Sequence, residues 1–267
     1  MDLQLAFICM LTFIIHLIGT LAYSVRIAGV RTRRIAVSFA LFNILVLVSR
    51  TANSFQSPFL AKRIEDHLIH ASQHSLLADF RWLLLSATVA TLIGGFLIPS
   101  FQRLFSKAVR HFQAHRSVPK LLLHGFLKGG IRQLREVMVA PASGSLKGMN
   151  VRQDISVGMM AMNVAAVALW TVGVFAALYA GYLDPEVRMT SSNLSAIVNG
   201  VATVMMFVFI DPQLSVMTDD VMEGKMGEPQ FRRVIIWLVG SRLLGTLLAQ
   251  LLLLPASRLI AAVAGWL

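Results

Sequence analysis

Eight polar residues lie within or beside long apolar runs of this sequence, where their side chains could hold a charged ligand inside a membrane. A charged side chain in the hydrocarbon core costs about 2.5–3.5 kcal/mol on insertion scales, so it is expected to face protein, water or ligand. Arginine suits phosphate because its planar guanidinium donates paired hydrogen bonds. The eight candidates for binding an anionic substrate are Arg50, Asn53, Asn43, Arg242, Asp211, His16, Asn163 and Asn199.

Arg50 belongs to the second apolar run and is expected within a membrane helix. Residues 35–48 are too few to cross the hydrocarbon core, which takes about 20 helical residues, so the helix must continue toward a break expected at Pro58. Asn43, Arg50 and Asn53 are separated by seven and three residues and therefore share one helical face. This polar face either lines a cavity, or Arg50 extends to the outer interface of the membrane.

The other apolar runs also carry polar side chains at helical spacing. Counted along the expected helices, five of the candidates fall at a similar depth in the inner half of the membrane. One interpretation is a hydrophilic cavity open to the inside, with Arg242 near its floor and Arg50 near its exit. The other is a set of structural hydrogen bonds with one ion pair between Asp211 and Arg242. The five residues at this depth are His16, Asn43, Asn163, Asp211 and Arg242.

The composition indicates the elements that must position these residues. The 267-residue chain is 56% hydrophobic and only 14% charged, and its mean hydropathy is +0.70. Soluble domains carry about a quarter charged residues, so this composition predicts an all-α, polytopic membrane protein. The net charge of +11 does not indicate nucleic acid, because the basic residues lie between apolar blocks, where the positive-inside rule explains them.

Six transmembrane helices are predicted in a single transmembrane domain covering residues 1–267. Inner loops then hold 17 of the 24 lysines and arginines, which places both termini outside. Six spans also divide into two three-helix halves of opposite orientation, the geometry of inverted-repeat transporters. The spans are expected at about residues 3–22, 35–55, 83–100, 155–179, 194–216 and 234–254.

Residues 101–153 form a long basic segment between the third and fourth spans, and this segment is expected on the cytoplasmic side. Phe101, Phe105 and Val109 recur at helical spacing, while Arg103 and Arg110 fall elsewhere around the helix. The pattern predicts an amphipathic helix that contacts anionic membrane lipids. The segment is either an ordinary loop resting on headgroups or a device that gathers an anionic substrate.

Motifs for other chemistry are absent from the sequence. HExxH, GxSxG, Walker and GxGxxG patterns do not occur in a usable context, so an enzyme and a nucleotide-driven pump are both disfavoured. Cys9 is the only cysteine, which excludes an intramolecular disulfide. His67, His70 and His74 share a helical face but are better explained as a solvated helix than as a metal site. We therefore expect no metal and no cofactor.

The stretch RTRRIAVSFALFNILVLVSRTANSFQSPFLAKRIEDH, together with the six-span layout, resembles the Amj family of bacterial lipid II flippases, described as alternate to MurJ. The resemblance implies a multi-pass protein of the bacterial plasma membrane. It also implies transport of undecaprenyl-pyrophosphate-linked disaccharide-pentapeptide from the inner to the outer leaflet. The pyrophosphate and the sugar-peptide head of lipid II would then be what the polar residues bind.

Two other functions remain compatible with the residues. The same cavity would serve a transporter of another polyprenyl-linked or small anionic substrate. A membrane scaffold protein acting through its basic loop would instead need neither Arg50 nor Arg242. The energy source and the oligomeric state do not follow from the sequence.

Overall fold

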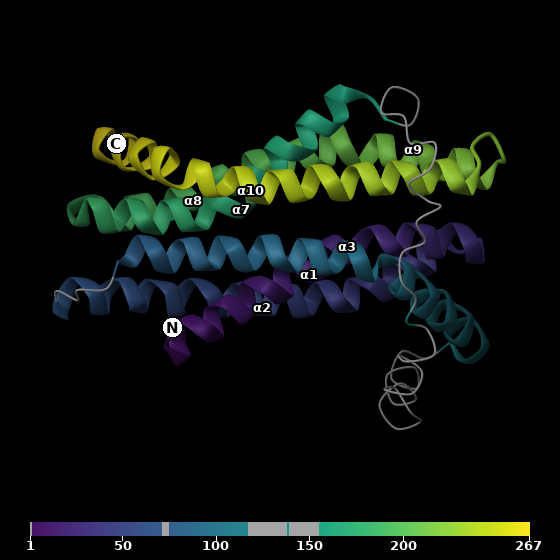
Figure 1. The fold of residues 1–267 in the computed structure, drawn as a ribbon, viewed down its shortest axis with the longest axis horizontal. Helices are drawn as coiled ribbons and strands as arrows, with labels where there is room; N and C mark the ends of the chain where they lie inside the picture. The colour runs from purple at the N-terminus through teal and green to yellow at the C-terminus, as the bar shows by residue number, and fades with distance from the viewer. Residues whose placement is uncertain (1, 71–74, 117–137, 139–154) are drawn as a thin grey trace.

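The structure is a computed structural model that describes residues 2–70, 75–116, 138 and 155–267. This part of the chain is helical and contains no strand. The helices lie side by side along the long axis of the molecule (Figure 1). In chain order the elements are α1 (Leu3–Thr32), α2 (Ile35–His70), α3 (Leu76–His115), α7 (Val157–Leu183), the 3-10 turn η2 (Pro185–Val187), α8 (Arg188–Val204), the π-helix η3 (Met205–Ile210), α9 (Asp211–Met222) and α10 (Glu228–Trp266).

Six helical stretches are long and apolar enough to cross a membrane, which confirms the predicted class. Five are single helices, and the fifth in chain order is the composite run Pro185–Met222. Most of the helices extend well beyond the apolar runs from which they were predicted. The second continues through Pro58 to His70, and the third includes residues 101–115 of the basic segment. The rest of that segment, apart from Met138, lies outside the described residues.

Local sequence signals fix several helix ends. The carboxylate of Asp2 accepts a hydrogen bond from the Leu5 N–H, and Ser75 and Ser156 cap α3 and α7 in the same way. α1 ends at Arg33, which adopts a left-handed conformation with φ of 54° and donates its N–H to the carbonyls of the last turn. The hairpin between α1 and α2 is therefore very tight.

The chain forms two three-helix halves, drawn below and above in Figure 1, that share one packing order. In the N-terminal half α1 packs against both α2 and α3, and in the C-terminal half α7 packs against both α8 and α10. The last helices of the two halves, α3 and α10, pack against each other. The three spans are 30, 36 and 40 residues long in the N-terminal half and 27, 38 and 39 residues long in the C-terminal half.

Two ends of the helix bundle can be distinguished. At the termini end lie the N-terminus, the C-terminus and the junction between α2 and α3 (Figure 1). At the opposite end, here called the basic end, lie the last turns of α1 and α3 and the first turns of α10 (Figure 1). These turns carry Arg31, Arg33, Arg103, Arg110 and Arg232.

Each end of the bundle is filled by an apolar cluster drawn from both halves. At the termini end, residues such as Leu60 and Phe80 pack against Tyr179 and Leu253. At the basic end, Ile27 and Ile98 belong to one cluster with Phe231. Between the two clusters lies a group of buried polar side chains, here called the polar layer, which come from α1, α2, α7 and α10 and are interspersed with apolar ones. The members of the polar layer are Thr12, His16, Thr20, Gln56, Asn163, Ser241, Arg242 and Thr246.

Candidate functional site

The centre of the polar layer is the guanidinium of Arg242, which α10 directs onto α1. Arg242 is only 7% exposed. A Cβ placed on Gly19 would lie 2.5 Å from one terminal nitrogen of the guanidinium, so the guanidinium rests directly on the glycine backbone. One helical turn further along α1, the Tyr23 hydroxyl interacts with the guanidinium. The absence of a side chain at position 19 thus makes room for a buried cation.

Arg242 has no carboxylate partner among the residues that the structure describes. Its Nε makes no hydrogen bond to the described protein. His16, one turn before Gly19, lies close enough to this guanidinium to interact with its charge, and its Nδ1 is also buried without a protein partner among the described groups. Burying a cation without a counter-charge is costly, so this arrangement has spare capacity to bind an anion.

Asn163 of α7 completes the layer from the other half. Its amide nitrogen donates to the Leu238 carbonyl at 3.0 Å and to the Ser241 hydroxyl at 2.7 Å. These two bonds fix the orientation of the amide and leave Oδ1 buried with no partner among the described groups. The same amide interacts with the Tyr23 hydroxyl. Donors and acceptors from α1, α7 and α10 therefore converge around Arg242.

The polar face predicted on α2 is present but is turned away from this layer. Asn43, Arg50 and Asn53 are all exposed. The opposite face of α2 is buried, and its Gln56 donates to the Thr12 hydroxyl of α1 at 2.5 Å. The same stretch of α2 also exposes Leu47, Val48 and Phe55, so its outer surface is mixed in polarity.

Asp211 pairs with a different arginine from the one predicted. Its Oδ1 accepts from Nη2 of Arg26 at 3.1 Å, and no ion pair with Arg242 is formed. The prediction failed because Arg26 was counted as a loop residue, whereas α1 continues to Thr32 and carries Arg26 into contact with the start of α9. Asn199 packs elsewhere, with its Oδ1 directly against Gly173 of α7.

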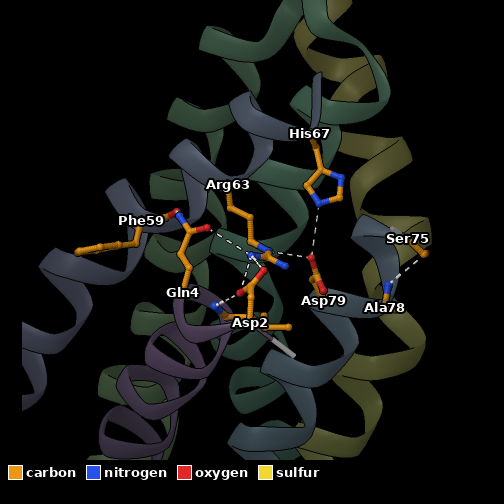
Figure 2. Close-up of polar contacts among 9 residues, drawn as sticks. Asp2, Gln4, Phe59, Arg63, His67, Ser75, Ala78 and Asp79 are labelled. Carbon is orange, nitrogen blue, oxygen red and sulfur yellow. Dashed lines mark hydrogen bonds and ion pairs between the residues drawn. The ribbon is translucent and has the colours of Figure 1, made fainter. Parts of the chain in front are cut away.

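A second buried cation lies at the termini end (Figure 2). Arg63 of α2 donates to Asp79 of α3 at 2.7 Å and to both carboxylate oxygens of Asp2 at 2.7 and 3.0 Å. His67 lies 3.8 Å from the same Asp79 oxygen, and Gln4 accepts a weaker bond from Arg63. The Leu5 N–H first, and then the Arg63 guanidinium, hold the pKa of Asp2 below its usual range. This fully paired cluster ties three helices together.

Sequence reasoning missed several residues that matter here. Gln56 and Arg63 lie on the buried face of α2, whereas the predicted polar face through Arg50 is the exposed one. Tyr23 is seven residues from His16, a spacing that could have placed both on one face of α1. The role of Gly19 had no sequence signal, because it depends on where α10 crosses α1.

The described residues contain no group of three or more His, Cys, Asp or Glu side chains placed to hold a metal ion. The described structure shows no pair of nucleophile and base in the polar layer, because the hydroxyls of Thr12, Thr20, Ser241 and Thr246 donate to backbone carbonyls rather than to the imidazole ring of His16. Its chemistry is recognition: a guanidinium and hydroxyl donors suit a phosphate group.

The fold and this layer define a multi-pass membrane protein with a buried cationic site between two apolar clusters. The family model described as "Amj: Alternate to MurJ" matches residues 11–264. A protein of Bacillus subtilis (strain 168), called lipid II flippase Amj, is 37% identical over 267 residues, covering 98% of this chain and 97% of its own length. No solved structure matches. The chain therefore belongs to the Amj family and is a multi-pass protein of the bacterial plasma membrane.

Proposed function

We propose that this protein is a lipid II flippase, a transporter rather than an enzyme, which moves the precursor from the inner to the outer leaflet. The relative of the same family that matches almost the full length of the chain carries this function in its name. The observation that carries the proposal within the molecule is the buried guanidinium of Arg242, which lacks a carboxylate partner among the described residues.

In this proposal Arg242 binds the pyrophosphate while the prenyl tail stays in lipid. His16 and Asn163 offer unpaired polar atoms beside Arg242, so an anion could gain hydrogen bonds there without displacing existing ones. The apolar clusters on both sides of the layer would have to open in turn, which keeps the site closed to one side of the membrane at a time.

The exposed polar face of α2 would guide the bulky sugar-peptide head. Asn43, Arg50 and Asn53 follow the helix along about half of the hydrocarbon thickness of a membrane, since ten residues rise about 15 Å. A head moving along this face would replace water on the polar side chains while α2 covers the layer behind it. Arg50 lies toward the end of this path.

The basic end is assigned to the cytoplasm by the positive-inside rule. Arg103 and Arg110 are exposed on α3 while Phe105 and Val109 are buried. This amphipathic end of α3 suits anionic headgroups, and each basic side chain near such a surface contributes about 1 kcal/mol. Lipid II would be collected at this end.

The test measures lipid II exposed on the outer leaflet of cells depleted of their other lipid II flippase, with an agent that cleaves lipid II only from outside. Wild type, Arg242→Gln, Arg50→Ala and an empty vector are compared at equal membrane abundance. We expect wild type to restore cleavage, Arg242→Gln to abolish it and Arg50→Ala to lower it.

Failure of wild type to restore cleavage despite good expression would overturn the flippase proposal. A transporter of another polyprenyl-linked or anionic substrate would then be favoured if wild type changed the growth of the cells and Arg242→Gln did not. A scaffold acting through the basic segment predicts that both arginine variants behave as wild type.

A further inference from the structure

Arg26 is the next buried cation beyond Arg242 toward the basic end. It lies seven residues after Gly19 and three after Tyr23, and therefore on the same face of α1 as the contacts of Arg242. Seven residues of α-helix span about 10 Å. A phosphate group moving along this face from the basic end would meet Arg26 before Arg242.

The contacts of Arg26 hold it between the two halves of the molecule. Nη2 donates to Asp211 of α9 at 3.1 Å, and Nη1 donates to the Ser215 hydroxyl at 3.3 Å. The guanidinium also lies 5.0 Å from the centre of the Phe39 ring of α2. The Arg26 side chain is 11% exposed, whereas that of Asp211 is 39% exposed. Asp211 is thus the more solvent-accessible partner, and its carboxylate can leave the pair for water.

The pairing uses little of what a guanidinium can donate. Only one nitrogen of Arg26 contacts one oxygen of Asp211, whereas guanidinium and carboxylate can form two parallel hydrogen bonds. A phosphate group presents more oxygens and more charge than a single carboxylate. It can accept hydrogen bonds from both terminal nitrogens of the guanidinium. A phosphate is therefore a stronger ligand for this arginine than Asp211 is.

The backbone around Asp211 is suited to movement. Asp211 follows the π-helix η3 and precedes Pro212, which has no N–H to continue the helical ladder. This interruption lies within the fifth membrane-spanning stretch, and most of the side chains of η3 are exposed or half-buried. Ile210 and Leu214 stay anchored in the cluster at the basic end, so the movement that this irregular backbone permits is a small one at Asp211 itself.

We propose that the Arg26–Asp211 pair is a latch at the basic end that an incoming phosphate group opens by taking the place of Asp211 on Arg26. Opening the latch frees the Arg26 guanidinium from Asp211 and gives the phosphate access to Arg242. This inference rests on the proposed function and names the first contact of its substrate within the bundle.

The experiment measures binding to the full-length protein in nanodiscs, with farnesyl pyrophosphate as the probe. Asp211→Asn removes the competing charge, so we expect the probe to bind about tenfold more tightly, the scale of one charge-assisted hydrogen bond. Arg26→Gln should weaken binding by a similar factor, and the double variant should match Arg26→Gln. Asp219→Asn, on an exposed position of the same helix, is the matched control and should bind as wild type.

Equal or weaker binding by Asp211→Asn would overturn the latch. If that variant does not accumulate, Ser215→Ala removes the other hydrogen bond of Arg26 and must change the affinity while Asp219→Asn does not.

Farnesol and inorganic pyrophosphate identify the source of the phosphate. Farnesol must show no dependence on position 211, and a dependence would contradict the proposal. Inorganic pyrophosphate that binds as tightly as the farnesyl form, with the same gain, supports a latch opened by a free anion.

The latch and the flippase proposal can fail separately. Tighter binding in Asp211→Asn, combined with a wild-type protein that moves no lipid II in cells, would keep the latch and reject lipid II as the cargo. Normal flipping with no change of affinity in Asp211→Asn would keep the cargo and reject the latch.

Discussion

Arg63 and Arg242 are almost equally buried but differ in their partners. Arg63 contacts the carboxylates of Asp2 and Asp79, while Arg242 contacts a glycine backbone and a tyrosine hydroxyl. A buried pair contributes mainly to stability and specificity of the fold, because each charge satisfies the other. A buried cation without a carboxylate partner destabilises the fold more, but it is available to bind an anionic ligand. The two arginines should therefore respond differently to substitution.

The first prediction concerns the paired arginine. Asp79→Asn leaves Arg63 with a neutral partner in a buried setting, so we expect a loss of about 1.5–3 kcal/mol in stability. Asp66→Asn removes an exposed i,i+4 pair with Lys62, which solvent screens, and should leave Tm almost unchanged. Thermal unfolding of the purified protein in detergent compares the two. Equal Tm values for both variants would show that the cluster in Figure 2 does not hold the three helices together.

The second prediction concerns the unpaired arginine. A methyl group at position 19 would collide with the guanidinium of Arg242, which is the flexible end of a long side chain and can move away. Gly19→Ala should therefore displace Arg242 and reduce lipid II exposure toward the level of Arg242→Gln, with Tm changed little. Gly240→Ala on α10, where an added methyl group meets nothing within 4 Å, is the control and should leave exposure unchanged.

At the scale of the elements, the sequence predicted which helices exist better than where they end. Apolar runs of about 20 residues are a strong signal, so all six spans were found. The extensions were missed because they contain charged residues whose partners lie on other helices or one turn away. Arg63 ends up between two carboxylates, and Glu228 pairs with both Arg31 and Arg232. Tertiary pairing of this kind has no local pattern.

The candidate residues show the same limit. His16, Asn163 and Arg242 were predicted at a common depth, and the structure brings their side chains together. Depth follows from counting along helices, whereas the direction of a side chain depends on how helices pack. The interpretation that paired Asp211 with Arg242 was therefore wrong, and the candidate Asn199 packs against Gly173, away from Arg242.

The third prediction tests two close helix crossings, α1 with α3 and α7 with α10. A Cβ on Gly94 of α3 would lie 2.8 Å from Thr20 of α1, and a Cβ on Gly245 of α10 would lie 2.8 Å from the Val164 carbonyl of α7. Alanine at either glycine should cost about 1–3 kcal/mol, because the helices must move apart. Gly240→Ala should raise stability by up to about 1 kcal/mol through helix propensity. The order of the three Tm values checks the packing, and a stable Gly94→Ala would contradict it.

At the scale of the whole molecule, the similarity of the halves is in packing order rather than in recognisable sequence. α1 and α7 are central in their halves, and Gly94 and Gly245 make the close crossings in corresponding third helices. Three crossings separate corresponding helices, so they run in opposite directions across the membrane. This is the arrangement of inverted-repeat transporters, in which the substrate site lies where the repeats meet. The polar layer around Arg242 occupies such a position, because its residues on α1 and α2 come from one half and those on α7 and α10 from the other.

The fourth prediction follows from how the halves share their interior. Both apolar clusters contain residues of α1 or α3 together with residues of α7 and α10, so neither half can bury its interior face alone. Fragments 1–130 and 131–267, expressed together, should therefore assemble and co-purify, while either fragment alone should be degraded or aggregate. An intact chain carrying a protease site at the same position controls for the cut itself.

Co-expressed fragments should also restore lipid II exposure, because every group assigned to the path lies on the described helices and not on the connection between residues 116 and 155. Assembly with no restored exposure would mean that the connection takes part in transport, as a basic segment that gathers substrate would. A single fragment that stays soluble in detergent and restores exposure would contradict the shared interior and, with it, a site built between the halves.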